Sequence, residues 1–531
     1  MTASAGVGAD IRWAFYAATG SSSGGRSSIS PLGTHHWRAW AIARSLVEMC
    51  SYRDQRAPMV SCPRAIATLT LVSILTGCGS SGPIVYDASL RERTFDTYHG
   101  AMVEHYPDAH EAGIDTAEFR SKWRDAVVNA QSVTEYYHTL ARMCYAMGDP
   151  HLVLRPNYEL WETHDGPLGA TDLCVLQVHG RPVLWNRSHD LLQSFGLKSS
   201  SEDKNLNGWT IEAFNGSRFM NDSTLRSVLN IGPEGSELVV RLRSPADESQ
   251  LTLHRRRGLD VDVEARDHLE ITFSGTQLFA KAKEINRQFV DDWATFASTV
   301  AVYHGTYFSA WALDGVGIFV WLPSKTLPRS DEGTELLQAD LDAAADILQG
   351  TTCTLIDLRF QPGGLSSGFT MVMERLLSGG VKMVAANQTK ELFGLITVTH
   401  ARTIPDSSSI TSGPAVILVN EFTGSYGEWM ASLLRRDLGA PIVGARTSGS
   451  EYCIVDVEGP DGSSLRFGGA PYRRFGDIPA FQGVGITPDI VVATAEGDLL
   501  GQSVQDTLIE THKRQWQAAW DLLRPYRELG D

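Results

Sequence analysis

The sequence predicts an α/β protein in which an N-terminal helical region and a small β domain precede the main core. From about residue 311 onward, apolar strand-like runs alternate with helical segments, an order typical of a largely parallel sheet. Residues 84–154 carry an apolar stripe at helical spacing, whereas residues 165–257 hold short β-rich runs separated by Gly, Asn and Pro. With 531 residues the chain is too long for one core and fits two to four domains.

The composition limits the classes of function. With 43% hydrophobic and 20% charged residues, the chain reads as an ordinary globular protein. Its formal net charge of −16 argues against a nucleic-acid partner, because phosphate contacts need basic patches. None of the seven cysteines forms a C-x-x-C pair, so we expect no zinc site, and no motif calls for a metal or a cofactor.

The segment that precedes the helical region differs from the rest of the chain. Residues 1–58 are partly Ser/Gly-rich, and we interpret them as a disordered segment or an upstream mis-start. Residues 59–83 combine one arginine, an apolar stretch too short to span a bilayer, and "LTGC" followed by a Gly/Ser tether. This segment resembles a bacterial lipoprotein signal with Cys78 as the acylated residue, which implies a protein anchored by lipid in the cell envelope. The alternative is a buried helix with an incidental cysteine.

The helical region is expected to end where Gly148 and Pro150 prevent continuation. Its apolar stripe consists of Phe119, Trp123, Val127, Tyr136, Leu140 and Met143. The main core is expected over residues 300–500, and a C-terminal helix over residues 501–531. The elements predicted within the core are the strands Gly315–Leu322, Cys353–Phe360, Ala415–Asn420 and Ala440–Ala445, helices over Glu335–Gln349 and Met371–Leu377, and a closing turn and strand over Gly483–Val492.

One corner of this core carries a serine between two glycines. In "AVILVNEFTGSYGEW" a buried strand ends just before Ser425, and a helix begins at once. Ser425 and Glu428 have the S-x-x-E form of a capping box. Equally, the serine could be a nucleophile presented at a helix N-terminus. The G-x-S-x-G motif of α/β-hydrolases is excluded, because Thr423 stands where its first glycine belongs.

Four motifs together resemble peptidase family S41, the tail-specific and C-terminal processing proteases. "LIDLRFQPGG" is similar to the family's D-L-R-x-N-x-G-G loop, with Gln361 in place of asparagine. "TGSYGE" is similar to T-x-S-x-x-E, "GVGITPDIVV" to G-x-G-x-x-P-D-I-x-V, and "MGDPHLVL" to a D-x-H segment. The resemblance covers roughly residues 90–495. It implies a ClpP/crotonase-like core preceded by a PDZ-like β domain.

The resemblance also implies roles for matching residues. Ser425 is the expected nucleophile, and the backbone amides of Gly363 and Gly364 are the expected oxyanion donors, since bare backbone allows a close approach. Glu428 corresponds to the S-x-x-E carboxylate, where capping and catalysis are compatible. The expected substrate is a protein or peptide, whose C-terminal carboxylate the PDZ-like domain would bind.

The expected catalytic base departs from the processing-protease branch. That branch places a lysine 25 positions after the serine, and here Ser450 occupies that position. The tricorn-like branch instead uses a histidine from the helical region, where this chain has His151, and a neutral imidazole is a competent base near pH 7. That branch also has a glutamate just before the G-x-x-P-D-I turn, where this chain has Gln482.

Three interpretations therefore remain open. The first is an exported, lipid-anchored serine peptidase that uses Ser425 and His151. The second is a catalytically inactive protein of the same fold that binds peptides or hydrophobic ligands. The third is an unrelated α/β enzyme such as an enoyl-CoA hydratase relative, which would lack the PDZ-like insertion. The sequence does not determine the oligomeric state.

Overall fold

The computed structural model divides the chain into two compact units, Met1–Pro83 and Ile84–Asp531. The predicted lipoprotein signal with Cys78 falls in residues 1–83, which lie outside the described residues. The structure describes residues 84–170, 175–178, 181–184, 209–215, 217–218, 228, 231–244, 248–255, 302–322, 330–364, 366–377, 382–391, 394–403, 410–411, 413–469, 472–474, 478–494 and 504–527.

The N-terminal part of the described chain is helical, as predicted. Each helix begins at a side chain that accepts an amide N–H of the first turn: Asp87, Thr116, Ser132 and Asn157. The last helix lies beyond the predicted end at residue 154, because Asn157 restarts a helix after a short strand. The helices are α4 (Ala88–His105), α5 (Ala117–Val128), α6 (Val133–Tyr145) and α7 (Tyr158–Asp165), and the strand is β1 (Val153–Arg155).

A hairpin from late in the chain packs into this helical region. It consists of β18 (Cys453–Glu458) and β19 (Ser464–Gly469), and β19 pairs with β1. Asp461, fully buried in the hairpin turn, accepts hydrogen bonds from the hydroxyls of Tyr136 (2.8 Å) and Tyr137 (3.1 Å). The helices and this hairpin therefore share one hydrophobic core.

The strands expected within residues 165–257 form a small antiparallel sheet and a separate strand pair. In β8 (Glu237–Arg243) buried and more exposed side chains alternate, as expected where one face of a sheet is covered. The sheet contains β3 (Val175–Val178), β4 (Arg181–Leu184), β5 (Thr210–Phe214), β6 (Ser217–Arg218), β8 and β9 (Glu248–His254). The separate pair is β2 (Leu168–Ala170) with β7 (Ile231–Pro233).

The core is built on a largely parallel sheet in the order β10-β11-β12-β13-β16-β17-β21. The strands from β12 onward run parallel, and β10 and β11 are antiparallel additions. Its strands are β10 (Val302–His304), β11 (Phe308–Leu313), β12 (Val316–Trp321), β13 (Cys353–Asp357), β16 (Ala415–Val419), β17 (Ile442–Gly444) and β21 (Ile490–Val491).

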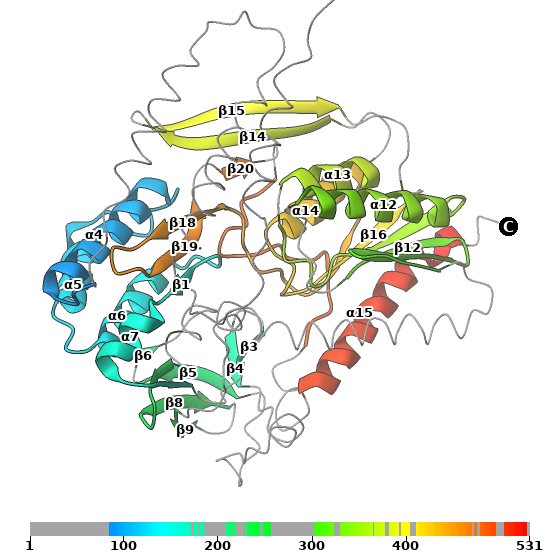
Figure 1. The fold of residues 1–531 in the computed structure, drawn as a ribbon. Helices are drawn as coiled ribbons and strands as arrows, with labels where there is room; N and C mark the ends of the chain where they lie inside the picture. The colour runs from blue at the N-terminus through cyan, green and yellow to red at the C-terminus, as the bar shows by residue number, and fades with distance from the viewer. Residues whose placement is uncertain are drawn as a thin grey trace, which may run out of the picture. The chain divides into compact units, whose positions relative to one another are not determined.

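Helices cover both faces of this sheet, which explains the continuous apolar runs of its central strands. In Figure 1, α12, α13 and α14 lie on one face and α15 on the other. Accordingly, Phe319 packs in the cluster with the first three helices, whereas its neighbour Ile318 packs with Trp520 of α15. The helices are α12 (Asp331–Leu348), α13 (Ser366–Leu376), α14 (Tyr426–Leu438) and α15 (Val504–Arg527).

A further antiparallel sheet was not predicted from the sequence. It has the order β15-β14-β20 and consists of β14 (Lys382–Glu391), β15 (Gly394–Thr403) and β20 (Tyr472–Arg474). Among the helices within the described residues, none is long and apolar enough to cross a membrane.

Candidate active site

Two loops meet at the C-terminal edge of the parallel sheet, where its topology favours ligand binding. β13 and β16 are parallel neighbours with every residue buried. The first loop, residues 358–364, follows β13 and leads toward α13. The second loop, residues 420–425, follows β16 and leads into α14. The predicted "LIDLRFQPGG" loop and the Ser425 corner therefore lie side by side.

Buried polar side chains fasten the two loops together. The Oδ1 atom of Asn420 accepts the amide N–H groups of Phe360 and Phe422, each at 3.1 Å. The hydroxyl of Thr423 donates to the carbonyl of Leu358 at 3.0 Å. Sequence reasoning gave Asn420 and Thr423 no role of their own, although Thr423 is the threonine of the T-x-S-x-x-E motif.

Ser425 has a strained backbone. Its φ is 52° and its ψ is −122°, and it immediately precedes the first residue of α14. A non-glycine residue in such a sparsely populated region costs about 1–3 kcal/mol, and strain of this kind clusters at functional sites. The corner therefore has the sharp strand-to-helix geometry that exposes a nucleophile, even though it lacks the G-x-S-x-G motif.

Gly424 and Gly427, the two glycines beside Ser425, allow neighbouring loops to pack closely against this turn. The amide of Gly424 donates to the carbonyl of Gln361 at 2.9 Å. A Cβ atom on Gly427 would lie 2.5 Å from that same carbonyl oxygen, and a Cβ on Gly424 would lie 2.9 Å from the hydroxyl of Ser448. A side chain at Gly427 would therefore push the two loops apart, whereas one at Gly424 would displace Ser448.

Gly363 lies directly against Ser425. A Cβ atom on Gly363 would lie 2.5 Å from the Cβ of Ser425 and 3.0 Å from its Oγ, and the φ of Gly363 is 98°. Gly364 follows with a φ of 140°. The Gly363 amide donates to Oε1 of Gln361, and the buried Nε2 of Gln361 has no hydrogen-bond partner within the described part of the chain. In this state the expected oxyanion donor is therefore engaged within its own loop.

A buried ion pair holds the base of the same loop. Arg359 and Asp357 lie 2.6 Å apart and are almost fully shielded from solvent. Arg359 also donates to the carbonyl of His512 and to Oε1 of Gln515, each at 3.2 Å, on α15. These contacts connect α15 to residues 358–364 and stabilise that loop.

Glu428 is fully buried and acts as an acceptor for the neighbouring loop. Its carboxylate accepts the amides of Ser425 (3.0 Å), Gly449 (2.7 Å) and Ser450 (2.7 Å) and the hydroxyls of Thr447 and Ser448. Burial raises the pKa of Glu428 to about 7, and these hydrogen bonds oppose that rise. The contact with Ser425 is the Glu428 half of the predicted capping box.

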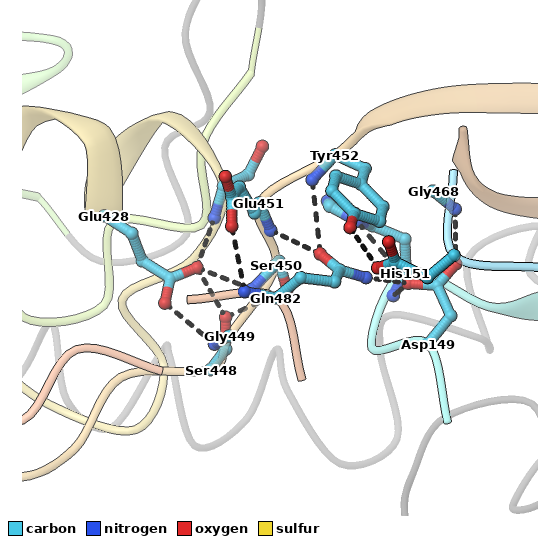
Figure 2. Close-up of polar contacts among 12 residues, drawn as sticks. Asp149, His151, Glu428, Ser448, Gly449, Ser450, Glu451, Tyr452, Gly468 and Gln482 are labelled. Carbon is cyan, nitrogen blue, oxygen red and sulfur yellow. Dashed lines mark hydrogen bonds and ion pairs between the residues drawn. The ribbon is translucent and has the colours of Figure 1, made fainter. Parts of the chain in front are cut away.

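Both ring nitrogens of His151 are buried, and neither has a hydrogen-bond partner among the residues that the structure describes. Its Nδ1 lies 3.9 Å from Oδ1 of Asp149. Burial lowers the pKa of His151, the charge of Asp149 raises it, and Arg466 lowers it further. The structure therefore forms no hydrogen bond between His151 and Ser425. In Figure 2, residues 448–452 and Gln482 lie between Glu428 and His151.

Gln482 links the loop that follows β17, which includes Glu451 and Tyr452, to the segment that carries His151. Its Oε1 accepts the amides of Glu451 (2.8 Å) and Tyr452 (3.3 Å), and its Nε2 donates to Oδ1 of Asp149 at 2.9 Å (Figure 2). Asp149 belongs to the quoted "GDPH" segment but had received no role. Its importance depends on a contact between distant parts of the sequence, which no local pattern signals.

The arrangement can support acyl transfer. Ser425 lies in a strained turn beside Gly363, and the carboxylate of Glu428 accepts its amide. His151 lies on the other side of residues 448–452 (Figure 2). Among the described residues, no group of three or more His, Cys, Asp or Glu side chains could hold a metal ion.

Comparisons with known proteins point to one family. The model of peptidase family S41 matches residues 330–492. The carboxyl-terminal-processing peptidase 3 of Arabidopsis thaliana chloroplasts is 30% identical over 154 residues, which are 29% of this chain and 28% of that protein. The carboxy-terminal-processing protease of Bartonella bacilliformis is 28% identical over 165 residues, 30% of this chain and 36% of that protein. The matched region thus spans about a third of each relative.

Solved structures of similar chains extend further but with low identity. The photosystem II D1 C-terminal processing protease is 16% identical and covers 79% of this chain and 97% of its own, with a TM-score of 0.39. Mature CPAF in complex with lactacystin is 12% identical and covers 80% and 98%, with a TM-score of 0.48. On these sequence matches, residues 330–492 of this chain are similar to peptidase family S41, a family of serine peptidases.

Proposed function

We propose that this protein hydrolyses peptide bonds in protein or peptide substrates, with Ser425 as the nucleophile. Ser425 Oγ attacks the substrate carbonyl carbon, its proton passes to a base, and the C–N bond breaks as the leaving amine takes that proton. Water then hydrolyses the acyl-enzyme by the same steps. The observation that carries the proposal is the strained conformation of Ser425 against Gly363.

His151 is the proposed base, in the manner of the tricorn-like branch. Ser450 stands at the position of the processing-branch lysine, and its amide is committed to Glu428. Burial lowers the pKa of His151 and keeps the imidazole neutral and able to accept a proton. Catalysis by this route requires the ring to come within hydrogen-bond reach of Ser425 on substrate binding, and apo sites are often looser than reacting ones.

The finer features of the fold remain part of this proposal. We assign a ClpP/crotonase-like architecture to the core and a PDZ-like role to the sheet β3-β4-β5-β8-β9. An exposed edge of such a sheet can add a substrate's C-terminal segment as a further strand.

The proposed location is the cell envelope, with the chain anchored through acylated Cys78. Because several acyl chains bind a membrane stably, wild-type protein expressed in bacteria should sediment with membranes, and Cys78→Ser should be released into the soluble fraction. A fully soluble wild type whose N-terminus is not residue 78 would show the anchor to be wrong.

A second candidate function is ligand binding without chemistry. Two observations favour it: the Gly363 amide is engaged by Gln361, and His151 has no hydrogen bond to Ser425. Such a protein would bind peptides or hydrophobic ligands in the same site and would not need a reactive serine.

A fluorophosphonate probe distinguishes the two candidates. Peptidase activity predicts labelling at Ser425 and cleavage of C-terminal peptides, both lost by roughly 1000-fold or more in Ser425→Ala with the fold retained. Ser432→Ala, a buried serine on the same helix, is the matched control and should label normally. Folded wild type that neither labels nor cleaves would instead favour the binding protein.

A further inference from the structure

The carboxylate that would orient the catalytic histidine in the tricorn-like branch is replaced by Gln482 in this chain. The structure offers another carboxylate close to the same imidazole. We propose that Asp149 is the positioning residue for His151 and that Gln482 holds Asp149 in place, an inference that rests on the proposed function.

Asp149 is held by three hydrogen bonds. Its Oδ1 accepts the His151 amide at 3.0 Å and Nε2 of Gln482 at 2.9 Å, and its Oδ2 accepts the amide of Gly468. A carboxylate has about four acceptor positions, so roughly one remains for an imidazole N–H. The nearest ring atom is Nδ1 of His151, 3.9 Å from Oδ1, and a small rotation of the ring would close that gap.

The hydrogen bonds of Gln482 orient its side chain to bind Asp149. Its Oε1 accepts two backbone amides, which fixes the orientation of the side-chain amide and directs Nε2 toward Asp149. A glutamate at residue 482 would place two carboxylate oxygens about 2.9 Å apart, and like charges at that distance disfavour each other. Gln482, the departure from the branch, is therefore compatible with the carboxylate of Asp149, which belongs to the D-x-H segment that this chain retains.

The groups that face this pair have opposing effects. Arg466, on β19, lowers the pKa of His151, whereas Asp149 raises it. Tyr106, at the end of α4, also faces Asp149, and burial together with the Asp149 charge keeps its phenol neutral by raising its pKa. When His151 takes a proton from Ser425, Asp149 is the carboxylate placed to stabilise the imidazolium and to hold Nδ1–H so that Nε2 faces the reaction.

The test compares three variants by NMR titration of histidine ring signals, assigned with His151→Gln. Asp149→Asn should lower the pKa of His151 by about one unit, because an opposite charge within about 4–6 Å shifts a pKa by that amount or more. Arg466→Gln should shift it in the opposite direction. Asp461→Asn, the matched control, removes an equally buried carboxylate that bonds Tyr136 and Tyr137, and should leave the His151 titration unchanged.

The same shift should appear in the reaction. The acidic limb of fluorophosphonate labelling against pH should move with the pKa of His151 in each variant, and kcat should fall in Asp149→Asn with KM nearly unchanged. An unchanged His151 titration in both Asp149→Asn and Arg466→Gln would overturn the pairing. A wild type that never labels would instead overturn the proposed function, while the titration would still decide whether Asp149 and His151 interact.

Discussion

Replacing Gly363 by alanine tests the contact on which the proposed chemistry depends. The added Cβ would lie 2.5 Å from Cβ of Ser425, 3.0 Å from its Oγ and 3.1 Å from the amide of Tyr426. The positive φ of 98° costs an alanine about 1–2 kcal/mol. Overpacking typically adds about 1–3 kcal/mol. We therefore expect a loss of about 2–5 kcal/mol in the free energy of unfolding.

The assay combines urea denaturation with fluorophosphonate labelling. Gly439→Ala is the matched control, because Gly439 also has a positive φ, 65°, at the end of α14 but has no atom within 4 Å of an added Cβ. Its free energy of unfolding should fall only by the cost of the positive φ, about 1–2 kcal/mol, and it should label normally. Gly363→Ala should lose more stability and lose labelling, because the new methyl group displaces Ser425 or blocks the carbonyl's approach. Equal stability losses and normal labelling in both variants would refute the reasoning.

Two further predictions concern buried groups of the site. The folded-state pKa of Glu428 is about 7 against an ordinary value of 4.5, so its contribution to stability is full below about pH 4.5 and declines by about 3 kcal/mol as pH rises through 7. Urea denaturation of wild type and Glu428→Gln across pH 4–8 should show this decline in their difference, and parallel curves would contradict it. His151→Leu removes two buried nitrogens that have no partner in the described ranges, and should raise the free energy of unfolding by about 1–3 kcal/mol while labelling is lost. Urea denaturation midpoints measure the gain in stability, and a His151→Leu variant less stable than wild type would contradict it.

Local pattern predicted the elements whose apolar residues form a continuous run or recur at helical spacing. The runs in β12, β13 and β16 are continuous and buried, and α12 and α14 keep helical spacing, so composition and length identify them. The strands of the β15-β14-β20 sheet were missed. The sequence Lys382–Glu391 mixes charged, amide and apolar residues, and its pairing with Tyr472–Arg474 depends on a contact with a segment much later in the chain.

The site was predictable in its motifs but not in its geometry. Ser425 and Gly363 were identified from sequence, yet their mutual contact and the positive φ of Ser425 depend on two loops brought together by adjacent parallel strands. The roles of Asp149 and Asp461 depend on partners from the opposite end of the described chain, Gln482 for the first and the tyrosines of α6 for the second. The proximity of His151 to Ser425 stays a prediction.

The residues that differ from the family pattern, and His151, differ in how completely their polar groups are hydrogen-bonded. Ser450 donates its amide to Glu428 and shares a hydroxyl contact with Ser448 at 3.0 Å. Gln482 uses both ends of its side chain. Gln361 and His151, in contrast, retain buried polar atoms that find no partner among the described residues, and each such atom costs about 1–3 kcal/mol. A fold under selection for stability alone would favour apolar side chains at both positions. Both residues belong to the proposed active site, and under the proposed function a bound substrate and its transition state would supply the missing partners.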